Sequence, residues 1–165
     1  MRLELTVDGN FECPDDPGEI SYPSKPKRRS VTPEEADILA ELATGKHVLE
    51  IGTGLAVSTQ AMAKRAVEVV TIDIDPWVED PDLPRVTFLR DRPPIYTGQL
   101  FNMAFIDGSH RKSEVLKDID YCLGIRLIAI HDTYLDEVQE AIDESPIKLI
   151  KVYDTRCRLA TFTRQ

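Results

Sequence analysis

Cysteine is scarce in this chain: Cys13, Cys122 and Cys157 are the only three among 165 residues. They are odd in number and widely spaced, and no two form a C-x-x-C pair, so the sequence indicates neither a disulfide framework nor a zinc knuckle. A chain of this length buries roughly 70% of the surface that its unfolded form exposes, and it needs no crosslink to hold a core. We therefore expect one soluble domain in a reducing, cytoplasmic environment.

Long apolar runs and an excess of positive charge are also missing. No stretch approaches the ~20 apolar residues of a membrane-spanning helix, and Arg2 and Glu4 interrupt the segment that a signal peptide would keep apolar. The 20 basic residues are outnumbered by 29 acidic ones, which gives a formal net charge of -9. Nucleic-acid binders concentrate Lys and Arg on one face, so we expect neither nucleic acid nor a membrane as a partner.

The chain divides into an N-terminal arm, residues 1–31, and an α/β domain, residues 32–165. The arm is rich in proline and opens with an alternating apolar pattern that predicts a short strand. At Thr32 the pattern changes, because Thr is a good N-cap, Pro33 suits the first helical position and Glu35 completes a capping box. A helix is therefore predicted to begin there.

Beyond that helix, β-branched runs alternate with helical segments. Continuous apolar runs are typical of strands buried on both faces of a parallel sheet. We expect such strands at 47–51, 69–74, 86–89, 103–106 and 127–130, with helices at 58–66, 112–123 and 135–144. The last two runs, 147–153 and 158–162, are separated by four residues and must pair antiparallel. The predicted fold is a doubly wound, mainly parallel seven-stranded α/β sheet with an antiparallel edge hairpin.

A glycine turn follows the first predicted strand. Gly52 and Gly54 lie between this strand and a helix, where ligands bind in open α/β sheets. A nicotinamide-binding turn would have another glycine at position 57, where this chain has valine, so that class is disfavoured. Glu50, just before the turn, could pair with the ammonium group of a ligand. Asp73, after the second strand, could accept both hydroxyls of a ribose.

These segments resemble the class I S-adenosylmethionine-dependent methyltransferases over roughly residues 32–165. The resemblance implies a Rossmann-like sheet in the order 3-2-1-4-5-7-6, with Glu50 beneath the methionine portion of the cofactor. It also implies that Asp73 binds the ribose, that Asp91 accepts the adenine amine, and that Ser58 holds the methionine carboxylate. The implied cofactor contacts are Glu50, Gly52, Thr53, Gly54, Ser58, Asp73, Ile74, Asp91 and Asp107.

The chain departs from that family in three places. Ala56 stands where the family has a third glycine, and the segment 123–126 replaces the usual Pro-Gly-Gly before the fifth strand. Prolines at positions 76, 81 and 84 leave room for a turn where the family has a helix. The sequence therefore predicts a trimmed version of the fold. A structural α/β domain whose acids only cap helices stays open as an alternative.

Acidic and histidine side chains follow the fourth and fifth strands. Asp107 and Asp132 should converge because their strands are neighbours, and two carboxylates beside His131 suit a divalent cation. Both segments look like catechol-type, metal-dependent O-methyltransferases and their antibiotic-tailoring relatives. That likeness implies Asp107 and Asp132 as metal ligands, and Thr133 where those enzymes often have Asn. His110 falls where they have a general-base Lys, and its unperturbed pKa of about 6.5 suits that role.

Several alternatives remain at this end of the sheet. Asp132 could merely cap the helix predicted from residue 135, and His131 could pair with an acid or fill space instead of binding a metal. The leading prediction is methyl transfer from S-adenosylmethionine to a hydroxyl of a small molecule. Asp107 and His110 would be the catalytic residues. Assistance by Mg²⁺ or another divalent cation stays open. A protein of this fold that binds S-adenosylmethionine or S-adenosylhomocysteine without catalysis is the main alternative. The acceptor and the oligomeric state, a homodimer included, stay open.

Overall fold

The computed structural model describes residues 31–74, 83–94 and 100–164. The predicted arm lies outside these ranges except for Val31, which is buried beside the first helix. That helix, α1 (Pro33–Leu42), begins as predicted: Thr32 Oγ1 accepts from Glu35 N, and Glu35 Oε2 accepts from Thr32 N at 2.8 Å. The capping box read from the sequence is therefore present in full.

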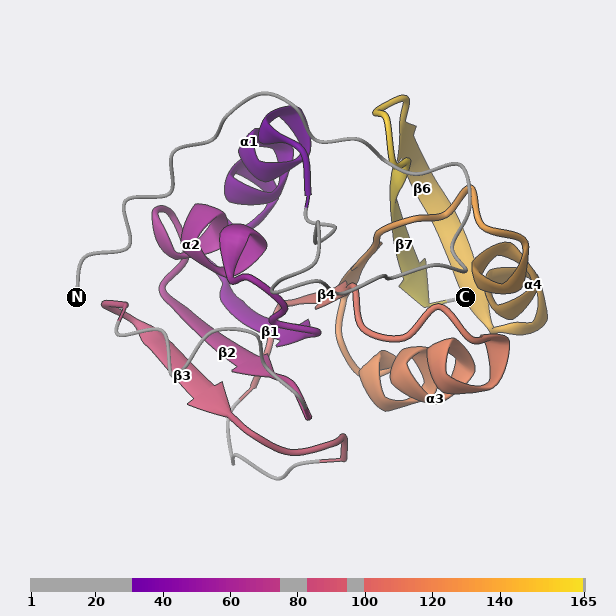
Figure 1. The fold of residues 1–165 in the computed structure, drawn as a ribbon, viewed down its shortest axis with the longest axis horizontal. Helices are drawn as coiled ribbons and strands as arrows, with labels where there is room; N and C mark the ends of the chain where they lie inside the picture. The colour runs from indigo at the N-terminus through magenta and orange to yellow at the C-terminus, as the bar shows by residue number, and fades with distance from the viewer. Residues whose placement is uncertain (1–30, 75–82, 95–99, 165) are drawn as a thin grey trace, which may run out of the picture.

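The described part of the chain has one sheet of seven strands, in the order β3-β2-β1-β4-β5-β7-β6 (Figure 1). Five strands, β1 to β5, run parallel, and β7 pairs antiparallel with both β5 and the edge strand β6. Their bounds are β1 His47–Ile51, β2 Glu68–Ile72, β3 Val86–Leu89, β4 Met103–Ile106, β5 Leu127–Ile130, β6 Ile147–Tyr153 and β7 Leu159–Arg164. The predicted fold class and strand order are confirmed.

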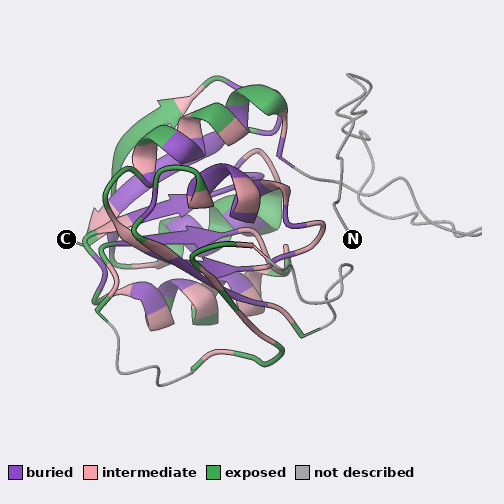
Figure 2. Cartoon of the chain, turned by 90° about the vertical axis from the view of Figure 1, so that its left-hand side faces the viewer, coloured by how far each residue is buried: buried purple, intermediate pink, exposed green. Residues whose placement is uncertain are grey.

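Helices cover both faces of this sheet. One core joins α1 and α2 (Val57–Ala63) to the strand residues Val48 and Phe105. The other core joins α3 (Lys112–Cys122) and α4 (Asp136–Glu144) to Leu49 and Ile106. Successive strand residues therefore point into opposite cores, as the period of two in a strand requires. Figure 2 shows the buried strands between the two layers of helices. None of the helices in the described ranges is long and apolar enough to cross a membrane.

Several predicted boundaries differ from the structure by one to three residues. The strand predicted at 69–74 spans Glu68–Ile72, and the side chain of Asp73, just beyond it, accepts a hydrogen bond from the glycine turn. The helix predicted to run to residue 66 ends at Ala63. The last strand begins at Leu159, since Arg158 adopts a left-handed turn conformation with φ of 48°.

Candidate cofactor and acceptor site

The glycine turn after β1 is fastened to the end of β2. The backbone N–H groups of Thr53 and Gly54 both donate to Asp73 Oδ2, each at 2.9 Å. The hydroxyls of Thr53 and Thr71 share a hydrogen bond of 2.6 Å. Asp73 thus shapes the turn itself, a structural role that its position in the sequence did not reveal.

Gly52 brings this turn against the end of β4. Its φ is 97°, and a Cβ at this position would lie 2.2 Å from the backbone oxygen of Asp107. Only glycine fits so close an approach. The expected cofactor turn therefore lies beside Asp107, the acidic residue directly after β4. Ala56, the departure from the family's third glycine, takes a left-handed φ of 59° as the residue before α2.

Glu50 lies under the turn and is fully buried. Ser58 Oγ and Thr59 Oγ1 each donate to one of its carboxylate oxygens. Burial raises the pKa of Glu50 to about 7, although the hydrogen bonds from Ser58, Thr59 and Thr71 oppose this change. The sequence suggested Glu50 and Ser58 as separate ligand contacts, but the structure joins them to each other. Ser58 and Thr59, the hydroxyl residues in the first turn of α2, are the sequence feature that could have indicated this pairing.

The remaining expected cofactor residues lie at the ends of β2 and β3. These ends are adjacent, because Asp73 N donates to Leu89 O at 3.1 Å. Ile74 is 51% exposed, and the exposed Asp91 accepts from Arg92 N at 2.7 Å. The structure therefore brings Asp73, Ile74 and Asp91 to one edge of the sheet, as the parallel order predicts.

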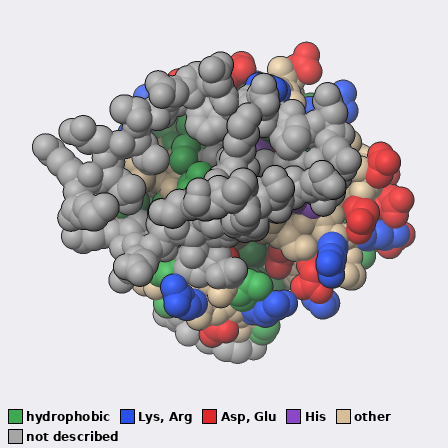
Figure 3. Space-filling view, in the orientation of Figure 1, with side chains coloured by type: hydrophobic (Ala, Val, Ile, Leu, Met, Phe, Trp, Pro, Cys, Tyr) green, Lys and Arg blue, Asp and Glu red, His purple; other side chains and the backbone are tan. Residues whose placement is uncertain are grey.

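Histidines and aspartates converge at the ends of β4 and β5, as expected. His131 Nδ1 lies 3.2 Å from Asp107 Oδ1 and 3.4 Å from Asp132 Oδ2. His110 Nε2 lies 2.9 Å from Asp132 Oδ2 and 3.9 Å from Asp107 Oδ1. This nitrogen is buried and makes no well-formed hydrogen bond among the described residues. We call these four residues the rim cluster; histidine surface is visible on this face beside acidic and basic side chains (Figure 3).

Attraction between the two histidines and the two aspartates favours the charged form of each group in the rim cluster. Burial by itself would lower the pKa of His110, but Asp107 and Asp132 outweigh it and raise that pKa to about 9. The pKa of His131 is likewise raised well above its usual value despite burial, mainly by Asp107. The pKa values of both aspartates fall below their usual range, since the histidines outweigh the effect of burial. The expected near-neutral His110 is thus corrected: its imidazole is protonated at neutral pH in this arrangement.

The structure changes the interpretation of two residues that follow β5, Asp132 and Thr133. Asp132 does not cap the following helix, because the residue before α4 is Leu135 and no side chain caps it; Asp132 instead adopts φ of 53° and faces the histidines. Thr133 Oγ1 donates to the backbone oxygen of Arg158 at 3.1 Å, which turns its hydroxyl to the hairpin. The helix-cap interpretation of Asp132 is therefore wrong.

The cluster offers a donor set that fits a divalent cation. One oxygen of Asp107, one of Asp132 and a nitrogen of His131 lie within 4.8 Å of one another. Atoms bound about 2.1 Å from one ion lie roughly 3.0–3.4 Å apart, close to the distances that His131 makes with both aspartates. A set that includes imidazole suits Mn²⁺, Co²⁺ or Zn²⁺ better than Mg²⁺, which prefers oxygen.

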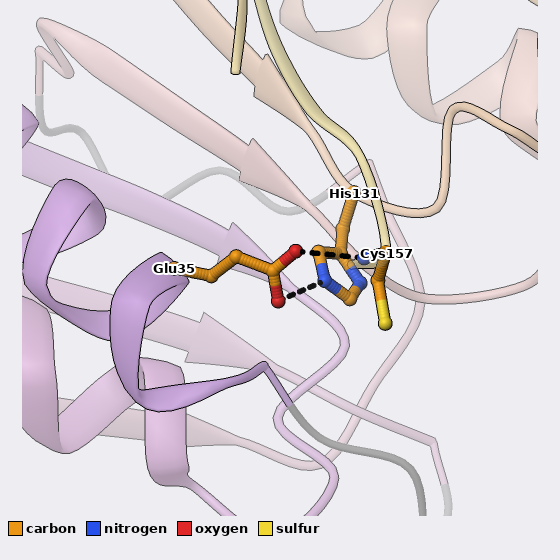
Figure 4. A group of neighbouring side chains, drawn as sticks. All are labelled: Glu35, His131 and Cys157. Carbon is orange, nitrogen blue, oxygen red and sulfur yellow. Dashed lines mark hydrogen bonds and ion pairs between the residues drawn. The ribbon is translucent and has the colours of Figure 1, made fainter. Parts of the chain in front are cut away.

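Glu35 is the site residue that sequence reasoning missed, because it was interpreted only as part of a capping box. Its carboxylate also faces His131 Nε2, at 3.0 Å (Figure 4). Cys157 completes a second group of potential metal ligands with these two residues. Both oxygens of Glu35 are already occupied, however, by hydrogen bonds from Thr32, His131, Thr155 and Cys157, so this group is closed as a hydrogen-bonded network.

Comparison with known proteins identifies the fold. No family model matches the sequence, and no curated protein sequence matches it either. Among solved structures, cofactor-bound Rv0187 from MTB matches with a TM-score of 0.67 and 20% identity, over 83% of this chain and 82% of that chain. The O-methyltransferase TomG from Streptomyces achromogenes, solved with SAM, has a TM-score of 0.60 and 15% identity, over 82% of both chains. The chain has the fold of class I S-adenosylmethionine-dependent methyltransferases.

An N-methyltransferase structure extends the likeness to a different acceptor atom. The N-methyltransferase NodS from Bradyrhizobium japonicum WM9, in complex with S-adenosyl-L-homocysteine, has a TM-score of 0.59 and 14% identity. The match covers 79% of this chain and 86% of that chain. The methyltransferase fold thus accommodates both O- and N-methyltransferases, so the acceptor has to be argued from the site.

Proposed function

We propose that this protein transfers the methyl group of S-adenosylmethionine to a hydroxyl of a small-molecule acceptor. The observation that carries the proposal is the contact between Gly52 and Asp107, which joins a glycine turn to a cluster able to hold and deprotonate a hydroxyl. The cofactor is proposed from the fold, because TomG and NodS have this fold and were solved with SAM and S-adenosyl-L-homocysteine.

In this proposal the cofactor lies along the ends of β1, β2 and β3, with its sulfur end beside the end of β4. The carboxylate of Asp73, which also holds the turn, accepts hydrogen bonds from the ribose hydroxyls. Ile74 offers an apolar face to the adenine. Asp91 accepts a hydrogen bond from the adenine amine. Gly52, Thr53 and Gly54 line the sulfur end together with Asp107. Glu50 and Ser58, which bind each other, support the methionine portion from below.

The rim cluster would bind the acceptor. His110 takes the hydroxyl proton at Nε2, the nitrogen that lacks a well-formed hydrogen bond. Because the pKa of His110 is about 9, the neutral base is scarce at pH 7 and becomes abundant as the pH rises to that value. A cationic ligand beside His110 would lower that pKa by charge repulsion.

Asp107, Asp132 and His131 would hold a divalent cation beside this base. When bound, such an ion supplies positive charge that lowers the pKa of a coordinated hydroxyl. His131 ligates through Nδ1 only after this nitrogen loses its proton, so we expect cation binding to release protons and to strengthen with rising pH.

Binding is the first test of this proposal. Calorimetric titration of the full-length protein with S-adenosylmethionine, S-adenosylhomocysteine and NAD should show micromolar-range binding of the first two only. D73A should weaken that binding on the order of tenfold or more, because it removes a partner of two hydroxyls and releases the turn. D120A, at an exposed acid of α3, is the matched control and should bind as the wild type does. Equal affinity in D73A and D120A would contradict the assignment.

Methyl transfer is the second test. Activity toward catechols and hydroxylated metabolites should rise with pH up to about 9, and H110A should lower it roughly a hundredfold while S-adenosylhomocysteine binding is retained. One observation favours the alternative of binding without catalysis: each rim aspartate already has an imidazole partner. Tight cofactor binding with no transfer to any acceptor, with or without Mn²⁺ or Mg²⁺, would favour that alternative.

A further inference from the structure

Glu35 makes more contacts than a helix cap needs. Its Oε2 accepts from the backbone of Thr32 at 2.8 Å and faces His131 Nε2 at 3.0 Å. Its Oε1 accepts from the Thr155 hydroxyl at 2.6 Å and from the Cys157 backbone at 3.2 Å. A capping box needs only the first of these four contacts. The other three join α1 to residues 96, 120 and 122 positions further along the chain.

Burial makes these extra contacts informative. The Glu35 side chain is fully buried, and a carboxylate inside a protein is unfavourable unless charged or polar partners surround it. Glu34, its neighbour in the same helical turn, is exposed and shows how a helix-terminal acid can stay in solvent. Helix capping alone therefore does not explain why Glu35 points inward.

The contact with His131 fixes how this ring meets the rim cluster. When Nε2 carries a hydrogen and donates it to Glu35, the opposite nitrogen, Nδ1, faces Asp107 and Asp132 at 3.2 and 3.4 Å. The ring is also held edge-on against Phe105, with the centroids 6.3 Å apart. Metal-binding histidines characteristically donate their second N–H to a carboxylate, which fixes the tautomer and the ring orientation.

We propose that Glu35 is a positioning residue: it holds the Nε2 hydrogen of His131 so that Nδ1 completes the cation site with Asp107 and Asp132. This inference rests on the cation site of the proposed function, and it gives α1 a part in the chemistry at the carboxyl ends of β4 and β5. Thr155 supports the same carboxylate from the β6–β7 turn. Glu35 itself touches neither cofactor nor acceptor in this proposal.

The decisive variant is E35Q, compared with E34Q as the matched control. Gln also serves in a capping box, so E35Q keeps the helix start and the side-chain volume while it removes the carboxylate that faces His131. E34Q removes the same charge from the same turn at an exposed position. The probe is Mn²⁺ alone, measured by electron paramagnetic resonance on the full-length protein. E35Q should bind Mn²⁺ about 10- to 100-fold more weakly than wild type, and E34Q should match wild type.

A second readout needs no metal. The chain has only three histidines, so nitrogen-15 resonances of the rings can be assigned with single substitutions. In the wild type the His131 Nε2 hydrogen should be present and slow to exchange, and E35Q should lose that protection. Should E35Q fail to fold, T155V removes one neutral support of the carboxylate and should still weaken Mn²⁺ binding severalfold.

The possible results separate this inference from the proposed function. Mn²⁺ affinity equal in wild type, E35Q and T155V, with the Nε2 hydrogen still protected, would show that Glu35 is only a cap and a packing residue. Absence of Mn²⁺ binding in the wild type would overturn the inference, while methyl transfer would still be judged by S-adenosylhomocysteine binding and activity. Loss of S-adenosylhomocysteine binding in E35Q but not in E34Q would also contradict it, because Glu35 would then act on the cofactor half.

Discussion

The candidate site has two halves: the cofactor half at the glycine turn, and the rim cluster. Their carboxylates are stabilised by different kinds of partner. Under the glycine turn, Glu50 and Asp73 are held by neutral donors, the hydroxyls of Ser58 and Thr59 and the backbone N–H groups of the turn. At the rim cluster, the carboxylates face imidazole rings instead. Neutral donors leave the charge of a buried acid uncompensated, whereas imidazolium groups balance it.

The pKa values record this difference. Burial prevails over hydroxyl donors at Glu50 and raises its pKa to about 7. At Glu35 burial also opposes ionisation, but the hydrogen bond and charge of His131 prevail and lower its pKa to about 2. The cofactor half is thus expected to gain stability on mild acidification, while the rim is expected to lose it at both pH extremes. Three substitutions test this contrast, from the largest expected effect to the smallest.

The largest effect is expected from H131A. This change removes a ring that is 4% exposed and leaves Glu35 buried without its charged partner. Breaking a buried ion pair from one side costs about 3–5 kcal/mol, so the free energy of unfolding at pH 7 should fall by that amount. Chemical denaturation measures it, and E35Q/H131A should recover part of the loss. A loss below about 1 kcal/mol would mean that the rim is not held by charge.

G52A should have the next effect, because its Cβ would meet the backbone of Asp107 at the junction of the two halves. Overpacking against backbone costs about 1–3 kcal/mol, and the displaced turn should also lose cofactor affinity. G54A is the matched control: its φ of 49° is also left-handed, but no atom lies within 4 Å of the added Cβ. Thermal unfolding should therefore separate the two variants. Equal melting temperatures would show that the junction is not tight.

E50Q should give an effect no larger than that of G52A, with the clearest pH signature. A folded pKa of about 7 against 4.5 for the ordinary group means that the ionised Glu50 disfavours the folded state increasingly between pH 4.5 and 7. The stability of E50Q relative to wild type should therefore rise across this window, by about 1–3 kcal/mol, and then stay level. Urea denaturation at a series of pH values measures it. A constant difference from pH 5 to 8 would contradict the buried, uncompensated state of Glu50.

The pH responses of His110 and Glu35 fall in other pH ranges than that of Glu50, and only Glu35 has the opposite sign. Because the pKa of folded His110 is about 9 against an ordinary 6.5, its contribution to stability is complete below pH 6.5 and is lost as the pH rises to 9. Glu35, with a folded pKa of about 2 against 4.5, contributes fully above pH 4.5 and loses its contribution as the pH falls toward 2. Both losses should occur equally in wild type and in E50Q. The difference in the free energy of unfolding between these two proteins therefore reports on Glu50 alone.

Local sequence was sufficient for the positions of most strands and helices along the chain, whereas the strand order was expected only from the family resemblance. The strands at 47–51, 86–89, 103–106, 127–130 and 147–153 have the predicted bounds. Burial on both faces explains the unbroken apolar runs of the central strands at 103–106 and 127–130, whereas the edge strand at 147–153 is mostly exposed. The capping box at Thr32 was equally readable, because its two partners are three residues apart. Parallel strands end at a common edge, and together with the strand order that the family resemblance implies, this predicts that Asp107 and Asp132 converge.

Tertiary structure alone decided which of these side chains hold one another. Glu35 and His131 are 96 residues apart, and nothing in a capping box indicates that its carboxylate reaches a distant imidazole. The pKa of His110 also depends on its distance from Asp132, so the unperturbed value of the residue type does not apply in the fold. Periodicity and caps are properties of neighbouring residues, and the sequence determines them directly. Burial, charge compensation and the contact of Gly52 with the end of β4 arise only when distant segments pack, and so they belong to the fold.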